Sequence, residues 1–235
     1  MQQLTLFSKN TARSLTIRPG RSRKNARAAR IAGTRWELWS QEMEVEKEMA
    51  LFFLDIRNFT PLVEKHQAID VIHIVKKLFS RFQNIIRVHR GQIIETSGDG
   101  FYAAFGFDRG AKEAVNASVQ AGKAILETLD NLNVQSFEKT LGQRIDVGIG
   151  IHVGKVATGN LHLGSKDHFV VMGYPVNVAS RLQTATKELN NNFIISSAVF
   201  KMLKNPQPNS NPVRVNLKGV TRACDLHLIG KAYAA

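Results

Sequence analysis

The stretch ALFFLDIRNFTP, residues 50–61, passes from an apolar run to an acidic residue and then to a helix start. The apolar residues at 50–54 predict a buried strand that ends at Asp55. Thr60 and Pro61 are typical of an N-cap followed by the first helical position, so a helix is expected to begin there. A strand that leads directly into a helix is a unit of folds in which helices cover a sheet.

Beyond this stretch, the apolar residues alternate between helical and strand-like spacing. In chain order, the sequence predicts a helix at 68–89, strands at 92–96 and 100–105, a helix at 111–132, a polar linker at 133–143, strands at 144–153, 155–161 and 169–172, a helix at 176–189, and strands at 213–217 and 225–229. The two strands on either side of Gly154 are expected to pair. The order β-α-β-β-α-β with appended strands predicts an α+β fold, a ferredoxin-like sandwich.

The composition is that of a globular protein, with 43% hydrophobic and 22% charged residues in a chain of 235. Its single cysteine, Cys224, excludes an internal disulfide framework and a cysteine-based zinc site. No apolar run reaches the roughly 20 residues that cross a bilayer, and the first residues do not have the pattern of a secretory signal. The expected location is therefore the cytoplasm.

The net charge of +13 is concentrated near the N-terminus, where residues 1–35 contain nine Lys or Arg and no acidic residue. We expect 1–35 to be a basic, disordered tail that could contact nucleic acid, another polyanion or an anionic membrane surface. Residues 36–48 are acidic, with apolar residues at helical spacing, and predict a short amphipathic linker helix. Residues 49–235 then form the main domain.

Two aspartates are expected to meet at one edge of the sheet. Asp55 ends the first strand, and Asp99 lies in the turn between two later strands. In a ferredoxin-like sheet these strands lie side by side, so both carboxylates emerge at the same edge. Adjacent carboxylates repel one another unless a divalent cation lies between them, and oxygen ligands suit Mg²⁺ or Mn²⁺ held jointly with a nucleotide's phosphates. The pattern predicts a metal-dependent nucleotide site.

Five segments, in order, resemble the catalytic domain of class III nucleotidyl cyclases, the adenylate and guanylate cyclases. These segments are FLDIRNFT at 53–60, ETSGDG at 95–100 with AFG at 104–106, GIHVG at 150–154 with GN at 159–160 and Gly164, VNVASRL at 176–182, and Lys218-Gly219. Together they span most of residues 50–229. Their combination and order make the resemblance specific, because each segment alone is short.

The resemblance implies a reaction and a set of roles. The product would be a 3′,5′-cyclic monophosphate, released with pyrophosphate for intracellular signalling. The implied site residues are Asp55, Asp99 and the Ile56 carbonyl for two Mg²⁺ or Mn²⁺ ions, Arg181 for the α-phosphate, Asn177 for the ribose, Lys218 for the terminal phosphates, and Phe59 and Thr60 for phosphate contacts at the helix start. In the family the metal aspartates and the Asn/Arg helix come from different subunits, which implies a head-to-tail homodimer with sites at the interface.

Two positions read the nucleobase in this family, and here they are Glu95 and Val170. Glu95 lies four residues before Asp99, and a carboxylate accepts hydrogen bonds from the N1–H and 2-amino groups of guanine. Val170 can neither donate nor accept. The expected substrate is ATP or GTP, and a pyrimidine cyclase that acts on CTP or UTP stays open, because the 4-amino group of cytosine would also satisfy a glutamate.

Other interpretations differ in class. The turn SGDGF at 97–101 resembles the G-G-D-E-F turn of diguanylate cyclases, but Gly100 replaces its glutamate and that family has no use for the Asn177/Arg181 helix. A catalytically degenerate, cyclase-like nucleotide-binding module and a nucleic-acid-binding protein with an inert body also remain open. His152, with no partners at metal-ligand spacing, is expected to be a packed structural histidine, and Cys224 an inert thiol.

Overall fold

The computed structural model describes residues 43–163, 166–206 and 211–233, so the predicted tail and residues 36–42 of the predicted linker lie outside the described residues. The elements are β1 (Met43–Ile56), α2 (Phe59–Lys65), α3 (Ala68–Val88), β2 (Gly91–Ser97), β3 (Gly100–Phe105), α4 (Ala111–Leu132), a π-helical turn (Asn133–Phe137), α5 (Glu138–Leu141), β4 (Val147–Leu163), β5 (Lys166–Met172), α6 (Tyr174–Glu188), β6 (Phe193–Ser196), α7 (Ser197–Met202), β7 (Val213–Val215) and β8 (Cys224–Leu228).

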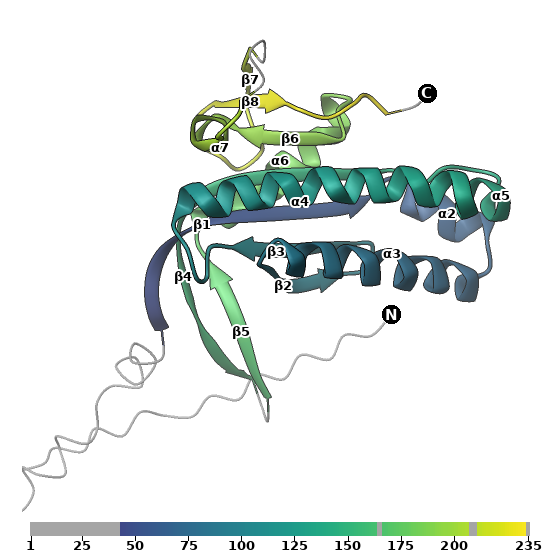
Figure 1. Cartoon of the computed structure of the whole chain (residues 1–235), viewed down its shortest axis with the longest axis horizontal. Helices are drawn as coiled ribbons and strands as arrows, with labels where there is room; N and C mark the ends of the chain where they lie inside the picture. Colours follow the sequence, from purple (N-terminus) through teal and green to yellow (C-terminus); the bar gives the residue numbers. More distant parts are fainter. Residues whose placement is uncertain (1–42, 164–165, 207–210, 234–235) are drawn as a thin grey trace, which may run out of the picture. The chain divides into compact units, whose positions relative to one another are not determined.

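One sheet runs through the described residues in the order β2-β3-β1-β4-β6-β8-β7, with β5 paired to β4. The pairs β2–β3, β3–β1 and β1–β4 are antiparallel, whereas β6 joins β4 in parallel. Strands β1 to β4 with α3 and α4 give the β-α-β-β-α-β order of a ferredoxin-like sandwich. The predicted α+β class and its appended strands are therefore confirmed (Figure 1).

Different helices pack against the two faces of the sheet. Ala50, Phe52 and Leu54 of β1 point to the face that α3 and α4 cover, and they join the largest buried cluster. Met49 and Leu51 point to the opposite face, against which α6 packs. Because side chains alternate along a strand, Asp55 belongs to this second face. The alternation thus places its carboxylate outside the main core, on the side of α6.

The predicted helix at 36–48 is wrong for its described part, because Met43 to Glu48 belong to β1. Met43 pairs with Gly159 and Glu48 with Lys155, so the second half of β4 extends the ladder. The apolar and acidic residues alternate here with a period of two as well as at helical spacing. Pairing with β4 gives the backbone N–H and C=O groups of these residues hydrogen-bond partners. A short isolated helix would be only marginally stable in water.

Four further local predictions need correction. The predicted hairpin across Gly154 is wrong, because β4 continues through this residue without a turn. A Cβ on Gly154 would lie 2.6 Å from Pro175 Cγ, so glycine is needed here for the close approach of Pro175.

Helix α2 begins at Phe59, directly after Asn58, and Pro61 is tolerated because first-turn N–H groups have no acceptor within the helix. The polar linker contains the π-helical turn and α5, and β6 and α7 lie where no element was predicted.

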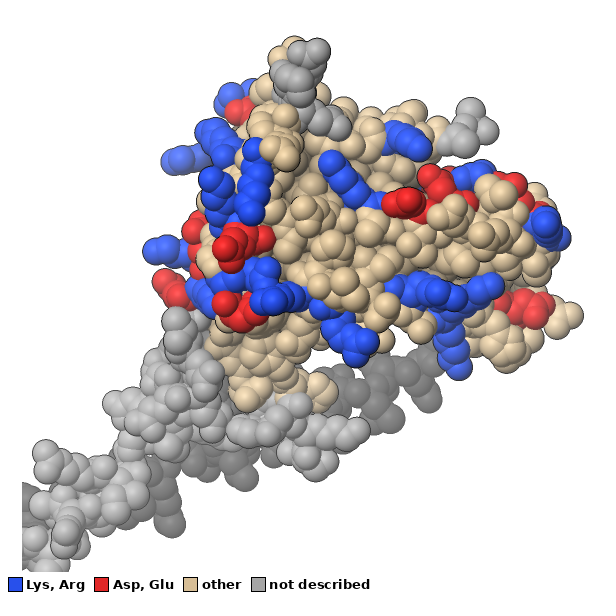
Figure 2. Space-filling model, in the orientation of Figure 1, with Lys and Arg blue, Asp and Glu red and all other residues tan. Residues whose placement is uncertain are grey.

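Side chains of both charges lie on the face of the molecule that Figure 2 shows. Figure 2 shows Lys and Arg interspersed with Asp and Glu on the side covered by α3 and α4. Among the residues that the structure describes, no helix combines the length and apolar character that crossing a membrane requires.

Candidate active site

Asp55 and Asp99 are brought together by the pairing of β1 with β3. Asp55 lies opposite Gly100 in the register, and the backbone N–H of Ile56 donates to the Asp99 carbonyl at 3.0 Å. A Cβ on Gly100 would lie 2.7 Å from the Leu54 carbonyl and 3.0 Å from Asp55 Oδ1. Only glycine admits this approach, so the sequence Asp99-Gly100 positions the second carboxylate beside the first.

The two carboxyl groups interact strongly. The pKa of Asp55 is raised to about 6, first by burial, then by the negative charge of Asp99 and a hydrogen bond shared with its side chain. Arg57 and the Ile56 backbone act in the opposite direction and lower the pKa. A raised pKa means that the ionised pair is costly without a counter-charge. A bound cation would remove that cost.

The donor set fits Mg²⁺ or Mn²⁺ held together with a substrate. Two carboxylates are available, and the side chain of Ile56 packs in the core, so its contribution would be its carbonyl oxygen. Among the described residues, no three His, Cys, Asp or Glu side chains cluster as a metal site. Hard divalent ions commonly complete their shell with waters and phosphate oxygens when the protein supplies few ligands. The pair is therefore suited to a metal–nucleotide complex.

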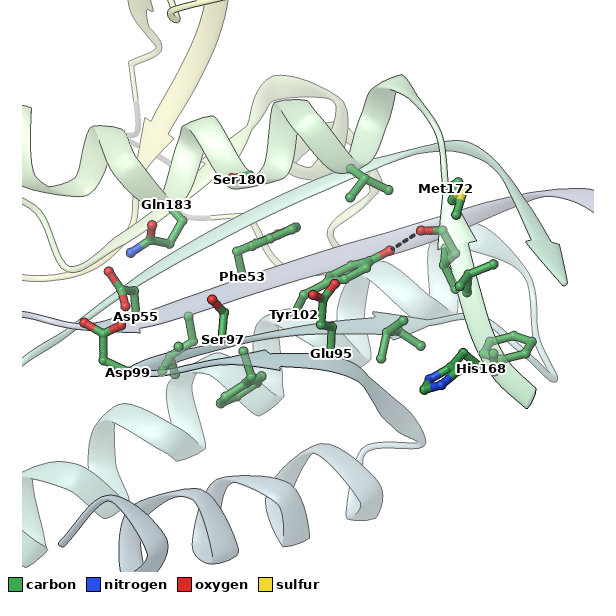
Figure 3. A pocket seen from close by; sticks show the side chains of 18 residues that line it. Phe53, Asp55, Glu95, Ser97, Asp99, Tyr102, His168, Met172, Ser180 and Gln183 are labelled. Atoms are coloured by element: carbon green, nitrogen blue, oxygen red, sulfur yellow. Dashed lines mark hydrogen bonds between the residues drawn. The ribbon is translucent and has the colours of Figure 1, made fainter. Parts of the chain in front are cut away.

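The aspartates lie at one end of a pocket of about 780 Å³ between β1, β2, β3, β5 and α6. Figure 3 shows Asp55 and Asp99 side by side, with Gln183 of α6 beside them and Glu95 and Tyr102 further along. His168 and Met172 of β5 lie at the other end. The pocket thus has an acidic end and an end with mixed polar and apolar lining.

Both predicted base-reading residues line this pocket. The ladder between β2 and β3 shifts between Ile93 and Glu95, so that Glu95 faces Tyr102 in the register. The bulge puts Ile94 and Glu95 both in the lining, which strict alternation would not do. Val170 comes from β5, opposite Gly159 of β4.

Arg57 holds α6 against the strand that carries Asp55. Its Nη2 donates to Thr186 Oγ1 at 2.9 Å and to the Gln183 carbonyl at 3.3 Å. Its guanidinium lies 5.9 Å from the ring centroid of Tyr233. Its Nε is buried without a hydrogen-bond partner among the described residues. A desolvated cation two residues from Asp55 also favours the ionised form of that carboxyl.

The remaining predicted residues do not line the pocket of their own chain. Asn177 and Arg181 are exposed on α6, while Ser180 and Gln183 of the same helix face the pocket. Lys218 is exposed in the segment after β7. Phe59 packs toward the core and Thr60 is exposed, both in α2. Exposure of Asn177 and Arg181 leaves them accessible to a second subunit.

Tyr102, His168 and Gln183 are among the lining residues that the sequence analysis did not single out. Tyr102 is buried, and it also lines the pocket. The alternation of side chains along β3 could have predicted this position. Asp55 lies opposite Gly100 in the register, so Tyr102, two residues after Gly100, points to the same face of the sheet as Asp55. No comparable signal identified His168, because β5 enters the sheet of the described residues through its pairing with β4 alone.

Two residues have structural surroundings, as predicted. His152 Nδ1 lies 2.8 Å from Ser196 Oγ, and burial lowers the pKa of His152 to about 4. Cys224 is half-buried, and burial together with the charge of Asp225 raises the pKa of its thiol. Both groups are neutral at pH 7 and lie away from the pocket lining.

The fold and this pair of carboxylates define a nucleotidyl cyclase catalytic domain. The family model described as the adenylate and guanylate cyclase catalytic domain matches residues 41–229. The chain belongs to this family.

Relatives carry the same domain within longer proteins. An adenylate cyclase of Anabaena cylindrica is 30% identical over 161 residues, which cover 68% of this chain and 32% of that protein. Adenylate cyclase 1 of Rhizobium meliloti is 25% identical over 182 residues, 77% of this chain and 27% of that protein. The chain therefore spans about a third or less of the length of these relatives.

Solved cyclase structures share the fold. The adenylyl cyclase CyaB of P. aeruginosa superposes with a TM-score of 0.70 at 23% identity, covering 80% of this chain and 96% of that one. The guanylyl cyclase Cya2 gives a TM-score of 0.72 at 23% identity, with 81% and 95% covered. Neighbours of both nucleotide classes are equally similar, so fold likeness does not select a base.

Proposed function

We propose that this chain is a class III nucleotide cyclase that converts a purine nucleoside triphosphate, ATP or GTP, into its 3′,5′-cyclic monophosphate and pyrophosphate for signalling in the cytoplasm. The observation that carries the proposal is the Asp55–Asp99 pair, whose carboxyls interact at the end of a pocket large enough for a nucleotide. Family membership supplies the reaction class.

Asp55, Asp99 and the Ile56 carbonyl would hold two Mg²⁺ or Mn²⁺ ions. Ions held there would lower the pKa of the ribose 3′-hydroxyl and neutralise charge on the phosphates. Arg57, which donates a hydrogen bond to Thr186, lowers the pKa of Asp55 by its positive charge and so favours the ionised carboxyl. Phe59 and Thr60 would contribute their first-turn backbone N–H groups to the phosphates.

The residues on α6 act on the substrate itself. Arg181 stabilises the charge that develops on the α-phosphate, and Asn177, one helical turn earlier, orients the ribose. Lys218 neutralises the terminal phosphates. Because Asn177 and Arg181 are exposed and absent from the lining of their own pocket, we propose that they serve the site of a partner subunit in a head-to-tail homodimer.

Complementation between inactive variants tests site and dimer together. Asp99→Asn and Arg181→Ala should each abolish turnover with Mn²⁺ while the circular dichroism spectrum and dimer mass are unchanged. When the two variants are unfolded and refolded together in equal amounts, half of the dimers carry one intact site. The mixture should therefore recover about a quarter of wild-type activity.

The outcomes separate the alternatives. Full activity of Asp99→Asn would refute the metal assignment. If both single variants are inactive and their refolded mixture recovers no activity either, the site is not shared between subunits. Binding of triphosphates by the wild type without any cyclic product would instead identify a catalytically degenerate module.

A further inference from the structure

Two isoleucines are exposed on the outer side of α3, although this helix packs on the sheet. Ile69 is 54% exposed and Ile72 is 47% exposed. They lie one helical turn apart, so their side chains are neighbours on the helix surface. The residues that α3 buries against the core lie on its other side and are Val71, Ile74, Leu78, Phe82 and Ile86. Packing within the domain therefore leaves about half of each isoleucine in water.

The same side of α3 is basic. Lys76 and Arg87 follow Ile69 by about two and five whole turns, so the three side chains lie along one line of the helix. Lys76 is also the neighbour of Ile72 on the next turn. All four residues are exposed. Apolar and cationic side chains thus share one surface, which we call the α3 surface and define by Ile69, Ile72, Lys76 and Arg87.

The charge of this part of the chain is mainly of one sign. Residues 59–88, which comprise α2 and α3, contain five Lys or Arg and two acidic residues, a net charge of +3. All residues after the basic segment 1–35 together have a net charge of +4, so 59–88 supply most of it. The acidic residue of α3, Asp70, lies about 100° around the helix from Ile69. Figure 2 shows Lys and Arg gathered where Figure 1 draws α3.

We propose that the α3 surface docks on an anionic lipid bilayer, with Lys76 and Arg87 among the phosphate headgroups and Ile69 and Ile72 inserted at the boundary of the acyl chains. The negative potential of anionic lipids attracts the cations, and the apolar side chains gain by leaving water. A nucleic acid would use the cations alone and would leave the isoleucines exposed. The presence of both on one line of the helix therefore favours a bilayer.

Docking through α3 leaves the candidate active site accessible. Helices α3 and α4 cover one face of the sheet, whereas the pocket lies on the face against which α6 packs (Figure 1). Asn177 and Arg181 are exposed on α6. A docked subunit therefore keeps its pocket free for a substrate and its α6 free for a second subunit.

Sedimentation of the full chain with lipid vesicles tests both parts of the α3 surface. The wild type should bind vesicles of phosphatidylcholine with about 30% phosphatidylserine, and bind far less to phosphatidylcholine alone. Lys76→Gln with Arg87→Gln should lower the partition coefficient about 25-fold, since each charge near the surface contributes about fivefold. Ile69→Ser with Ile72→Ser should lower it about tenfold or more. Ile69→Leu with Ile72→Leu keeps the apolar side chains and should bind as the wild type.

The charge control is Lys187→Gln with Lys201→Gln, which removes the same charge from exposed positions on α6 and α7. It should change the partition coefficient by less than about threefold, because charges beyond a Debye length of the bilayer are screened. Elution from heparin controls for general attraction to polyanions, and the serine variant should elute at the wild-type salt concentration. Asp99→Asn should bind vesicles as the wild type does, so vesicle binding is tested separately from turnover.

The basic segment 1–35 is the main alternative source of vesicle binding. With its nine basic residues replaced by Gln, the chain should bind more weakly but should still lose affinity on Ile69→Ser with Ile72→Ser. Several results would overturn the inference: no vesicle binding by the wild type or by this neutralised chain, serine substitutions without effect, or a Lys76/Arg87 variant that binds no more weakly than the Lys187/Lys201 control. Circular dichroism and urea unfolding show that each variant compared is folded.

Discussion

Arg57 Nη2 donates a 2.9 Å hydrogen bond to Oγ1 of Thr186, and this contact joins the residue after β1 to the last turn of α6. Arg57 follows the Asp55 carboxylate by two residues, whereas Thr186 lies on the helix that presents Asn177 and Arg181. In the proposed dimer these two groups belong to different active sites. One contact inside a subunit thus fixes the relative position of residues that serve both.

Removal of the Thr186 hydroxyl should therefore reduce both stability and activity. Thr186→Val keeps the shape of this fully buried side chain but leaves the Arg57 guanidinium with one acceptor fewer. The Nε of this guanidinium already has no hydrogen-bond partner in the part of the chain that the structure describes. Hydrogen bonds to charged groups contribute about 1.5–3 kcal/mol, and we expect a loss of that size in the free energy of unfolding from urea titrations.

Thr184→Val is the matched control, since Thr184 lies on the same helix, is exposed and donates its hydroxyl hydrogen bond to the Ser180 carbonyl of its own helix at 3.2 Å. Its effect should stay within about 0.5 kcal/mol. If Thr186→Val unfolds at the same urea concentration as Thr184→Val, Arg57 does not hold α6.

Gly150 should be intolerant of even a methyl group. A Cβ there would overlap the backbone nitrogen of Gln183 and lie 2.8 Å from the Ala179 carbonyl, so α6 would have to move off the sheet. We expect Gly150→Ala to cost about 2 kcal/mol or more of stability and most of the turnover, because Asn177 and Arg181 move with the helix. Gly110→Ala, with open space around the added Cβ, should change neither by a comparable amount.

The residues that define the fold could be predicted where the pattern is local. The helical repeats at 68–89 and 111–132 identified α3 and α4 nearly to the residue, whereas the apolar run at 50–54 identified only the second half of β1. Gly154 misled the prediction because a glycine in a strand signals either a turn or a close neighbour, and only the packing of Pro175 distinguishes them. The strand β6 pairs in parallel with a distant strand and has four residues, too few for a periodic signal.

The site residues also differ in how far the sequence could predict them. The meeting of Asp55 and Asp99 follows from strand order, which the sequence supplied. Glu95 reaches the pocket together with Ile94 only because the β2–β3 ladder shifts there, and a single sequence does not show such a bulge. His168 enters through the pairing of β5 with β4, a tertiary relationship without a motif.

His152 should make the fold sensitive to mild acid. Burial lowers its pKa to about 4, against about 6.5 in an unfolded chain, so the folded protein binds fewer protons between these values. Its contribution is fully present above pH 6.5 and is lost as the pH falls toward 4, by on the order of 2–3 kcal/mol. When the free energy of unfolding is measured by urea titration from pH 4.5 to 7.5, it should depend less steeply on pH in His152→Asn than in the wild type.

His73→Asn, at an exposed position on α3, should keep the wild-type slope. Carboxylates such as Asp55 titrate in the same range in all three proteins, so the difference between their slopes isolates His152. Parallel curves for the wild type and His152→Asn would show that the imidazole is protonated within the fold.

Asp99→Asn should be more stable than the wild type without metal ions, and Mn²⁺ should stabilise the wild type alone. The Asp55 pKa of about 6 lies above its usual 3.8, so the folded protein loses stability as the pH rises from 3.8 to 6. In EDTA at pH 7.5, Asp99→Asn should thus be more stable than the wild type by about 1 kcal/mol, because the repulsion is relieved. Mn²⁺ should raise the Tm of the wild type and not that of the variant.

Glu127→Gln removes an exposed carboxylate on α4 and should respond to Mn²⁺ as the wild type does. A metal-induced Tm shift that survives in Asp99→Asn would place the ions elsewhere.

The basic segment 1–35 should act independently of catalysis. It contains nine basic and no acidic residues, whereas the other 200 residues have a net charge of +4, so affinity for polyanions should depend on this segment. Deletion of 1–35 should leave kcat/KM within about twofold and lower the salt concentration that elutes the protein from heparin, since fewer counterions are released on binding. Replacing the same nine residues by Gln separates charge from length and should reproduce the deletion. If either variant loses turnover while its dimer mass is unchanged, the segment takes part in the active site.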